Sequence, residues 1–352
     1  MFVVRPIARD DLPAVLALSE RTGTGLTTLP ASRERLAERI EASIASFSRS
    51  AKREDECYMF VLEDAGARTN DRRVVGISAI EAAVGLDEPW YNYRVGTLVH
   101  ASRALDVYTA VPTLFLANDH TGHTELATLF VDQAFRQGGN GPLIAKSRLL
   151  FIAEFADRFG EKVIAELRGL LDDEGRSPFW EGLGRHFFAM EYSTADYLTG
   201  IGQKAFIAEL MPRHPVYVNL LPRSARDAIA AVHADTAPAR RMLEQEGFRY
   251  EGYVDIFDAG PTVEAFRDNI DAVRRSRVLP VTLEEDDPVP DTHVAAGVRW
   301  LVANRRFHDY RAILATAPAR IDRFPLRPYA ADALGVHEGD SVRAVALRPA
   351  DR

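Results

Sequence analysis

One stretch of the chain combines a turn that suits a phosphate with the strand and helix needed to position it. The turn is Arg136-Gln-Gly-Gly139-Asn-Gly141. It follows an apolar run, Leu126 to Val131, that predicts a strand, and it precedes an amphipathic pattern that predicts a helix. A helix start offers unpaired backbone N–H groups and the positive end of its dipole, and glycines let a phosphate approach the main chain. The segment from Glu125 to Gly169 is therefore predicted to hold an anion.

The spacing within the turn discriminates between phosphate-binding motifs. It fits R-x-x-G-x-G, the pyrophosphate loop of the N-acetyltransferase (GNAT) superfamily, in which Arg136, Gly139 and Gly141 would hold the phosphates of an acyl-CoA. The dinucleotide fingerprint is not met because no third glycine follows Gly141. The P-loop pattern is not met because Lys146 does not stand in G-K-[ST]. An ordinary strand–helix turn is the alternative interpretation.

A second residue with suitable chemistry is His233, at the predicted junction between two helices. Acyl transfer from a thioester to an amine releases a thiolate whose conjugate acid has a pKa of about 8.5, and a histidine with a pKa of about 6.5 can protonate it at neutral pH. A lone histidine is more often structural, so this role stays a hypothesis. The hydrolase motifs G-x-S-x-G and H-E-x-x-H do not occur in the sequence.

Four neighbouring residues resemble metal ligands by type: Asp119, His120, His123 and Glu125. An H-x-x-H in an irregular stretch without a third placed ligand is weak support for a metal, and the threonines and glycine between them suit a turn. We therefore expect no metal and no cofactor.

Composition limits the class of protein. The chain has 352 residues, which allows about two domains, and a net charge of −8, which argues against nucleic-acid binding and weakly favours a cationic substrate. The single cysteine, Cys57, excludes an internal disulfide framework and is expected to be buried. The early charges predict no signal peptide, and no apolar run reaches the roughly 18 residues of a membrane span. We expect a cytoplasmic protein that does not bind membranes.

The apolar periodicity also predicts the elements around these residues. Strands are expected at Phe2 to Ile7, Tyr58 to Leu62 and Val74 to Val84, with a helix from Ser32 to Phe47. Trp90 to His123 is interpreted as a long, aromatic-rich connection. Two helix–glycine–aromatic units, which begin at Ser177 and Thr236, suggest a duplication, although common helix punctuation explains them equally well.

The sequence changes character after about Arg277. Short alternating runs indicate a small C-terminal β subdomain, and an acidic, proline-bearing linker, Glu284 to Pro290, divides them. We therefore predict a catalytic region over 1–276, which could comprise two related halves of about 1–200 and 201–276, and a small β subdomain over 277–352.

Several long strings resemble the arginine N-succinyltransferase family over nearly the whole chain, more weakly beyond about Val281. They are GLTTLP from Gly25, PWYNYRVGTLVH from Pro89, NDHTG from Asn118, AELRG from Ala165, SPFW from Ser177, KAFIAELMP from Lys204 and YVDIFDAGPT from Tyr253. The resemblance implies an α+β fold with a GNAT-like acyltransferase core, in which helices flank a mixed, largely antiparallel sheet. It also implies transfer of a succinyl group from succinyl-CoA, a substrate, to the α-amino group of L-arginine, the first step of arginine catabolism by this route.

The same resemblance implies residue roles. The family's succinyl-CoA-contacting leucine falls on Leu126, and its proton-donating histidine falls on His233. By charge type alone, Arg94 is a candidate for the succinyl carboxylate and Glu166 for the guanidinium, and a structural ion pair explains each equally well. Succinylation of ornithine or another basic amino acid, or a non-catalytic acyl-CoA sensor, are the alternatives. The oligomeric state is open, although an exposed strand edge or the β tail could form an oligomer interface.

Overall fold

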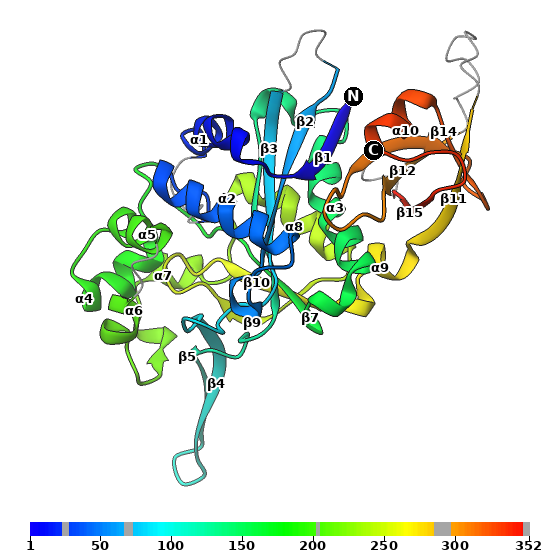
Figure 1. The fold of residues 1–352 in the computed structure, drawn as a ribbon. Helices are drawn as coiled ribbons and strands as arrows, with labels where there is room; N and C mark the ends of the chain where they lie inside the picture. Colours follow the sequence, from blue (N-terminus) through cyan, green and yellow to red (C-terminus); the bar gives the residue numbers. More distant parts are fainter. Residues whose placement is uncertain (23–27, 67–72, 202–204, 285–296, 348–352) are drawn as a thin grey trace.

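A computed structural model describes residues 1–22, 28–66, 73–201, 205–284 and 297–347 (Figure 1). The strings that begin at Gly25 and Lys204 lie partly outside these residues. The strands are β1 (Phe2–Pro6), β2 (Cys57–Asp64), β3 (Arg73–Glu81), β4 (Asn92–Ser102), β5 (Val107–Ala117), β6 (Thr124–Val131), β7 (Lys162–Glu166), β8 (Val216–Tyr217), β9 (Arg249–Val254), β10 (Pro261–Phe266), β11 (Arg277–Leu283), β12 (Val298–Ala303), β13 (Ala312–Ala317), β14 (Phe324–Leu326) and β15 (Ser341–Ala346).

Within the described residues, these strands form one mixed sheet in the order β14-β11-β15-β12-β13-β1-β2-β3-β6-β7-β10-β9-β4-β5-β8. The pairs β6–β7 and β11–β14 are parallel, and the other neighbours are antiparallel. The predicted mixed, largely antiparallel sheet is therefore confirmed.

Helices cover both faces of the central strands. They are α1 (Leu12–Ser19), α2 (Arg33–Phe47), α3 (Asn140–Glu154), α4 (Arg185–Phe188), α5 (Tyr192–Gly200), α6 (Ala205–Leu210), α7 (Arg223–Ala228), α8 (Ala237–Gln245), α9 (Asp271–Arg275) and α10 (Pro328–Leu334). Alternation along β2 sorts the faces, because successive side chains of a strand point to opposite sides. Cys57 and Met59 pack with α1 and α2, whereas Tyr58 and Phe60 pack with α3.

Helix α3 is held against the sheet by a buried arginine. Arg148 donates from Nη1 to the backbone carbonyls of Ala79, on β3, and Ala127, on β6, at 3.2 and 3.0 Å. Burial lowers the pKa of Arg148 to about 9. An arginine in a core is tolerated only when its donors are satisfied, so these carbonyls fix α3 and the middle of β6 relative to each other.

The C-terminal strands continue the sheet and also share contacts with the first part of the chain. Residues from β11 to β15 and α10 form their own buried apolar cluster. Val4 pairs with Ala312, and the Tyr310 hydroxyl donates to the backbone carbonyl of Ser147 at 2.8 Å. Arg305 and Arg343 both bond to Glu154, each at 2.7 Å. The C-terminal strands are thus attached to α3 as well as to β1.

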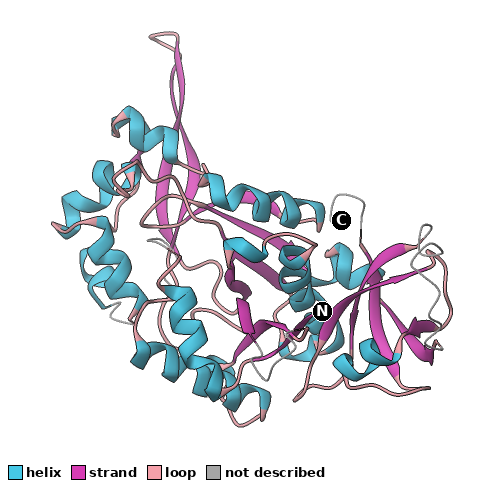
Figure 2. Cartoon of the chain, turned by 90° about the horizontal axis from the view of Figure 1, so that it is seen from above, coloured by secondary structure: helices cyan, strands magenta, loops and turns pink. Residues whose placement is uncertain are grey.

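The segment interpreted as a connection from Trp90 to His123 is instead mostly a hairpin. Strands β4 and β5 pair over eleven residues each and project beyond the rest of the molecule (Figures 1 and 2). Phe187 and Phe188, in the first of the two proposed repeat units, lie in helix α4, whereas the second unit runs from α8 into β9. The two units therefore differ in structure at this point.

No helix among the described residues has the length and apolar content that a membrane span requires.

Candidate active site

A cavity of about 920 Å³ lies between β6 and β7, where these two strands separate. They pair in parallel only at Thr124 with Val163 and at Glu125 with Ile164. Beyond those pairs, residues 126–130 of β6 and residues 165–168 at the end of β7 both line the cavity. Among the described residues, the divergence leaves one edge of β6 without a neighbouring strand from Leu126 onward.

A β-bulge in β6 accompanies the separation. In the pairing with β3, Ile77 lies opposite Phe130 and Ala79 opposite Ala127, so two residues of β6, Thr128 and Leu129, face one residue of β3. Thr128 has a φ of 50°, which is rare for a residue with a branched side chain. A bulge increases the local twist and bends the strand. It therefore turns β6 away from β7 at the cavity.

As predicted, the glycine turn leads into α3. A short 3-10 turn lies between β6 and the glycine turn. Gly138 and Gly139 adopt φ values of 69° and 88°, and Gly139 is the N-cap of α3 without a side-chain cap. A Cβ added at Gly141 would meet no atom within 4 Å, so the fold itself does not require this glycine. Arg136 lines the cavity and donates from Nε to the backbone carbonyl of Val131 at 3.0 Å. Residues 138–141 do not line this cavity, and Gly138 and Asn140 line a second, smaller one together with Arg299.

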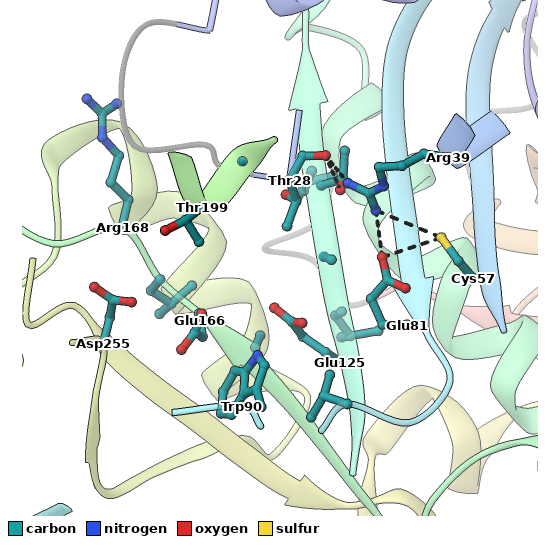
Figure 3. Close-up of a pocket in the computed structure, with 18 of the residues that line it drawn as sticks. Thr28, Arg39, Cys57, Glu81, Trp90, Glu125, Glu166, Arg168, Thr199 and Asp255 are labelled. Atoms are coloured by element: carbon teal, nitrogen blue, oxygen red, sulfur yellow. Dashed lines mark hydrogen bonds and ion pairs between the residues drawn. The ribbon is translucent and has the colours of Figure 1, made fainter. Parts of the chain in front are cut away.

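Carboxylates gather at the β7 side of the cavity (Figure 3). Glu166, the last residue of β7, accepts a hydrogen bond from Asn92 Nδ2 at 2.9 Å. Burial raises the pKa of Glu166 well above its ordinary value, and the nearby Asp255 and Glu125 raise it further. Burial likewise raises the pKa of Asp255 and of its neighbour Asp258. A cation bound among these groups would relieve their repulsion.

His233 lies beside the cavity without being part of its lining, whereas Asp235 and Thr236 do line it. The His233 backbone N–H donates to the carbonyl oxygen of Arg168 at 2.9 Å, and its Nδ1 accepts a hydrogen bond from the Asp235 N–H at 3.2 Å. Its side chain is 25% exposed. The bond to Nδ1 orients the ring, so Nε2 is the nitrogen that can face a substrate.

Arg94 lies elsewhere. It does not line the cavity, its side chain is 61% exposed, and its Nη1 is 3.8 Å from Asp119 Oδ2. Its guanidinium also lies over the ring of Tyr253, 5.8 Å from the centroid. Of the two interpretations that the sequence allowed for Arg94, the structure favours the ion pair over contact with the succinyl carboxylate.

The two histidines near Asp119 face each other. His120 Nδ1 is 3.1 Å from His123 Nδ1, and burial lowers the pKa of His120 to about 4. In the described part of the chain, no group of three or more His, Cys, Asp or Glu residues is placed to hold a metal ion.

Cys57 is buried, as predicted, at the opposite side of the cavity (Figure 3). Burial raises the pKa of its thiol, and the adjacent carboxylate of Glu81 raises it further. Arg39 bonds to Glu81 at 2.5 Å and lies 3.8 Å from Cys57 Sγ. A thiol held protonated in this way is a poor nucleophile.

Asp255 and Arg168 are among the charged residues of the cavity that were not predicted from the sequence. Arg168 follows Glu166 by two residues, directly after the apolar strand β7. Charged residues at the end of a buried strand are a usable signal, because they must face either solvent or a site. Asp255 has no comparable local signal, since a turn far along the chain brings it to β7.

Comparison with known families identifies the chain. The model of the family described as "Arginine N-succinyltransferase beta subunit" matches residues 2–272, and that of its C-terminal domain matches residues 277–346. The chain belongs to the arginine N-succinyltransferase family. It is therefore an acyltransferase.

Individual members of the arginine N-succinyltransferase family are similar over their whole length. An arginine N-succinyltransferase of Yersinia pseudotuberculosis is 53% identical over 348 residues, which cover 99% of this chain and 98% of the relative. One from Escherichia coli O139:H28 is 51% identical over 347 residues, with the same coverage. The solved structure of arginine/ornithine succinyltransferase subunit AI from Pseudomonas aeruginosa is 38% identical, covers 98% of both chains and superposes with a TM-score of 0.87.

Proposed function

We propose that the protein transfers the succinyl group of succinyl-CoA to the α-amino group of L-arginine. The products are N2-succinyl-L-arginine and CoA, in the first step of arginine catabolism by the succinyltransferase route. The observation that carries the proposal is the cavity between β6 and β7, which has an open strand edge and Arg136 on the β6 side and a cluster of carboxylates on the β7 side. Family membership supplies the reaction.

Succinyl-CoA would bind along β6. Its pantetheine arm is an extended chain with amide groups, and such a chain can hydrogen-bond to an unpaired strand edge, here from Leu126 onward. The phosphates would lie at the start of α3, near Arg136, Gly139 and Gly141. The positive φ of Gly139 and the open space above Gly141 support this position. In this arrangement the first part of the sheet acts as a GNAT-like core.

In the overall reaction a C–N and an S–H bond form, and a C–S and an N–H bond break. The uncharged α-amine attacks the thioester carbonyl carbon, the C–S bond breaks with its electron pair on sulfur, and the nitrogen releases its surplus proton to water. His233 would protonate the departing thiolate. Its ring is oriented by the Asp235 N–H, and its backbone is bonded to Arg168 at the cavity wall. Binding both substrates in one cavity would itself lower the activation barrier, because the amine and the thioester would already be held close together and oriented.

The guanidinium of the acceptor would bind at Glu166, with Asp255 beside it. The raised pKa of each carboxyl indicates that negative charge on these groups is unfavourable in the protein alone. A guanidinium donates in a planar fork that matches a carboxylate, and its charge would lower both pKa values again. A cation should therefore bind more favourably to this cluster than to an isolated surface carboxylate.

Ornithine is the second candidate acceptor. The relative from Pseudomonas aeruginosa is described as an arginine/ornithine succinyltransferase, and an ammonium can also pair with Glu166. The test is thiol release with succinyl-CoA, acetyl-CoA or no donor, each combined with arginine, ornithine, lysine or no acceptor. We expect release only with succinyl-CoA and a basic amino acid, fastest with arginine. Equal rates with acetyl-CoA would refute the donor, and binding of succinyl-CoA without turnover for any amine would indicate a sensor.

The division of the chain is also proposed. Residues 1–276 would form the catalytic region, within which a boundary near residue 200 stays a prediction, and residues 277–352 a small β subdomain. The separate apolar cluster of β11 to β15 and the separate family model support this division. We place the enzyme in the cytoplasm, where acyl-CoA substrates are made, and cell fractionation with an antibody would test this.

Self-association through the β4–β5 hairpin would complete the proposal. Leu105 and Tyr108 near its tip are exposed by 75% and 74%, and a two-stranded hairpin is marginally stable alone in water. The matching family is described as a subunit. A second copy packed on the hairpin would cover these side chains. Light scattering should give a mass above that of one chain, which Leu105→Asp should reduce, and a monomeric wild type would contradict the proposal.

A further inference from the structure

Arg168 is a cationic side chain in the cavity that the reaction scheme above does not use. It follows β7, lines the cavity, and its Nε is buried without a hydrogen-bond partner. In the part of the chain that the structure describes, no ion pair of Arg168 is found, although Glu166 and Asp255 line the same cavity. Figure 3 shows that the side chain points away from both carboxylates.

Burying the Nε of Arg168 without a hydrogen-bond partner is energetically unfavourable unless a ligand supplies an acceptor. Buried polar atoms in proteins are nearly always hydrogen-bonded, and one left unpaired needs an explanation. The charge of Arg168 does reach another cavity residue: burial raises the pKa of Tyr192, and Arg168 opposes this rise. That interaction does not supply Nε with an acceptor. A ligand in the cavity could.

We propose that Arg168 binds a substrate carboxylate. This inference rests on the proposed succinyl transfer, because both substrates of that reaction carry a carboxylate: the free end of the succinyl group and the α-carboxylate of the amino acid. A guanidinium presents donors in a fork that pairs with a carboxylate in two parallel hydrogen bonds. The negative cluster at Glu166 and Asp255 would repel a carboxylate, and the Arg168 side chain points away from that cluster.

The backbone of Arg168 connects this carboxylate site to the proton donor. Its carbonyl oxygen accepts the His233 N–H at 2.9 Å, so the segment that would hold the carboxylate also holds His233. In L-arginine the α-carboxylate and the attacking amine share one carbon. In succinyl-CoA two methylene groups separate the carboxylate from the reacting carbonyl. Either carboxylate at Arg168 would therefore bring a reacting group toward His233.

The test compares each substrate with a neutral analogue, in wild type and in Arg168→Met. One arm uses L-arginine against L-argininamide, and the other uses succinyl-CoA against butyryl-CoA, each measured as kcat/KM or, without turnover, as a competitive Ki. In one arm, Arg168→Met should lower kcat/KM for the charged substrate about thirty- to hundredfold and leave the neutral analogue within about threefold. The arm that responds identifies which carboxylate Arg168 binds.

Two further variants keep the result interpretable. Arg168→Lys retains the charge without the forked guanidinium, so its kcat/KM for the charged substrate should fall less than that of Arg168→Met. The lysine variant also keeps the inference testable if Arg168→Met misfolds. Arg223→Met, at an exposed arginine 3.5 Å from Asp227, should match wild type. Equal losses for charged and neutral substrates in both arms would overturn the inference. Wild-type turnover in the same experiment reports separately on the proposed function.

Discussion

The substitution Glu166→Gln should separate binding from stability. Glutamine keeps the shape of the side chain and can still accept the hydrogen bond from Asn92 Nδ2, now 2.9 Å from the carboxylate. It removes the charge that would meet the guanidinium. A hydrogen bond to a charged group contributes about 1.5–3 kcal/mol, and about 1.4 kcal/mol corresponds to a factor of ten. We therefore expect kcat/KM for arginine to fall roughly ten- to a hundredfold, with KM for succinyl-CoA unchanged.

Although Glu166→Gln should weaken arginine binding, it should increase the stability of the folded enzyme without substrate. Burial raises the pKa of Glu166 in the folded protein. Between its unfolded and folded pKa values, the folded state then binds more protons than the unfolded state, so this group's contribution to stability falls as pH rises through that window. Glutamine lacks this penalty. Glu166→Gln should raise Tm at pH 8 relative to wild type, and the gain should shrink as the pH falls toward about 3, where the carboxyl is protonated in both states.

Steady-state kinetics and thermal unfolding at several pH values test both parts of this prediction. Calorimetry in two buffers of different ionisation enthalpy adds a third readout, because arginine binding should release protons from the cluster in wild type and fewer in the variant. Glu244→Gln, at an exposed carboxylate paired with Arg240 on α8, is the matched control. A loss of kcat/KM below threefold, or a variant less stable than wild type at pH 8, would refute the reasoning.

Three further predictions concern His233, the glycine turn and Cys57. His233→Ala should lower kcat about 10²- to 10⁴-fold while CoA binding, measured by thermal stabilisation, stays within a few-fold, and an equal loss in both would contradict the proton-donor role. Gly139→Ala should lower the free energy of unfolding by about 1–2 kcal/mol because Gly139 has a positive φ. Gly141→Ala should leave stability unchanged and raise KM for succinyl-CoA. An unchanged KM would show that Gly141 is not part of the phosphate site. Cys57 should resist iodoacetamide at pH 8 until the protein is denatured, because burial raises the pKa of its thiol; rapid labelling of the native enzyme would disagree.

The central strand–turn–helix–strand segment could be predicted because its signals are local. Apolar runs and glycines specified β6, the turn, α3 and β7 to within a few residues. The β4–β5 hairpin was missed for an equally local reason. Its tip, Arg103 to Asp106, lacks the Asn-Gly or Asp-Gly pair typical of tight hairpins, and its strands contain Gly96 and Pro112, which are residue types that strands disfavour.

The site could be predicted only in part, because its form depends on contacts between distant segments. Glu166 was selected by charge type and lines the cavity, whereas Arg94, selected in the same way, does not. The bulge at Thr128 has no sequence signal, since threonine rarely adopts a positive φ. Because the bulge could not be predicted, the separation of β6 from β7 could not be predicted either. The proximity of Asp255 to the end of β7 is likewise a property of the fold.

The most direct test of the account is a crystal structure with CoA and N2-succinyl-L-arginine bound together. We expect the pantetheine arm along β6 beginning at Leu126, the phosphates at the start of α3, and the guanidinium at Glu166. His233 Nε2 should then lie within hydrogen-bonding reach of the CoA sulfur. A CoA bound away from the β6–β7 cavity, or a guanidinium that contacts neither Glu166 nor Asp255, would contradict it.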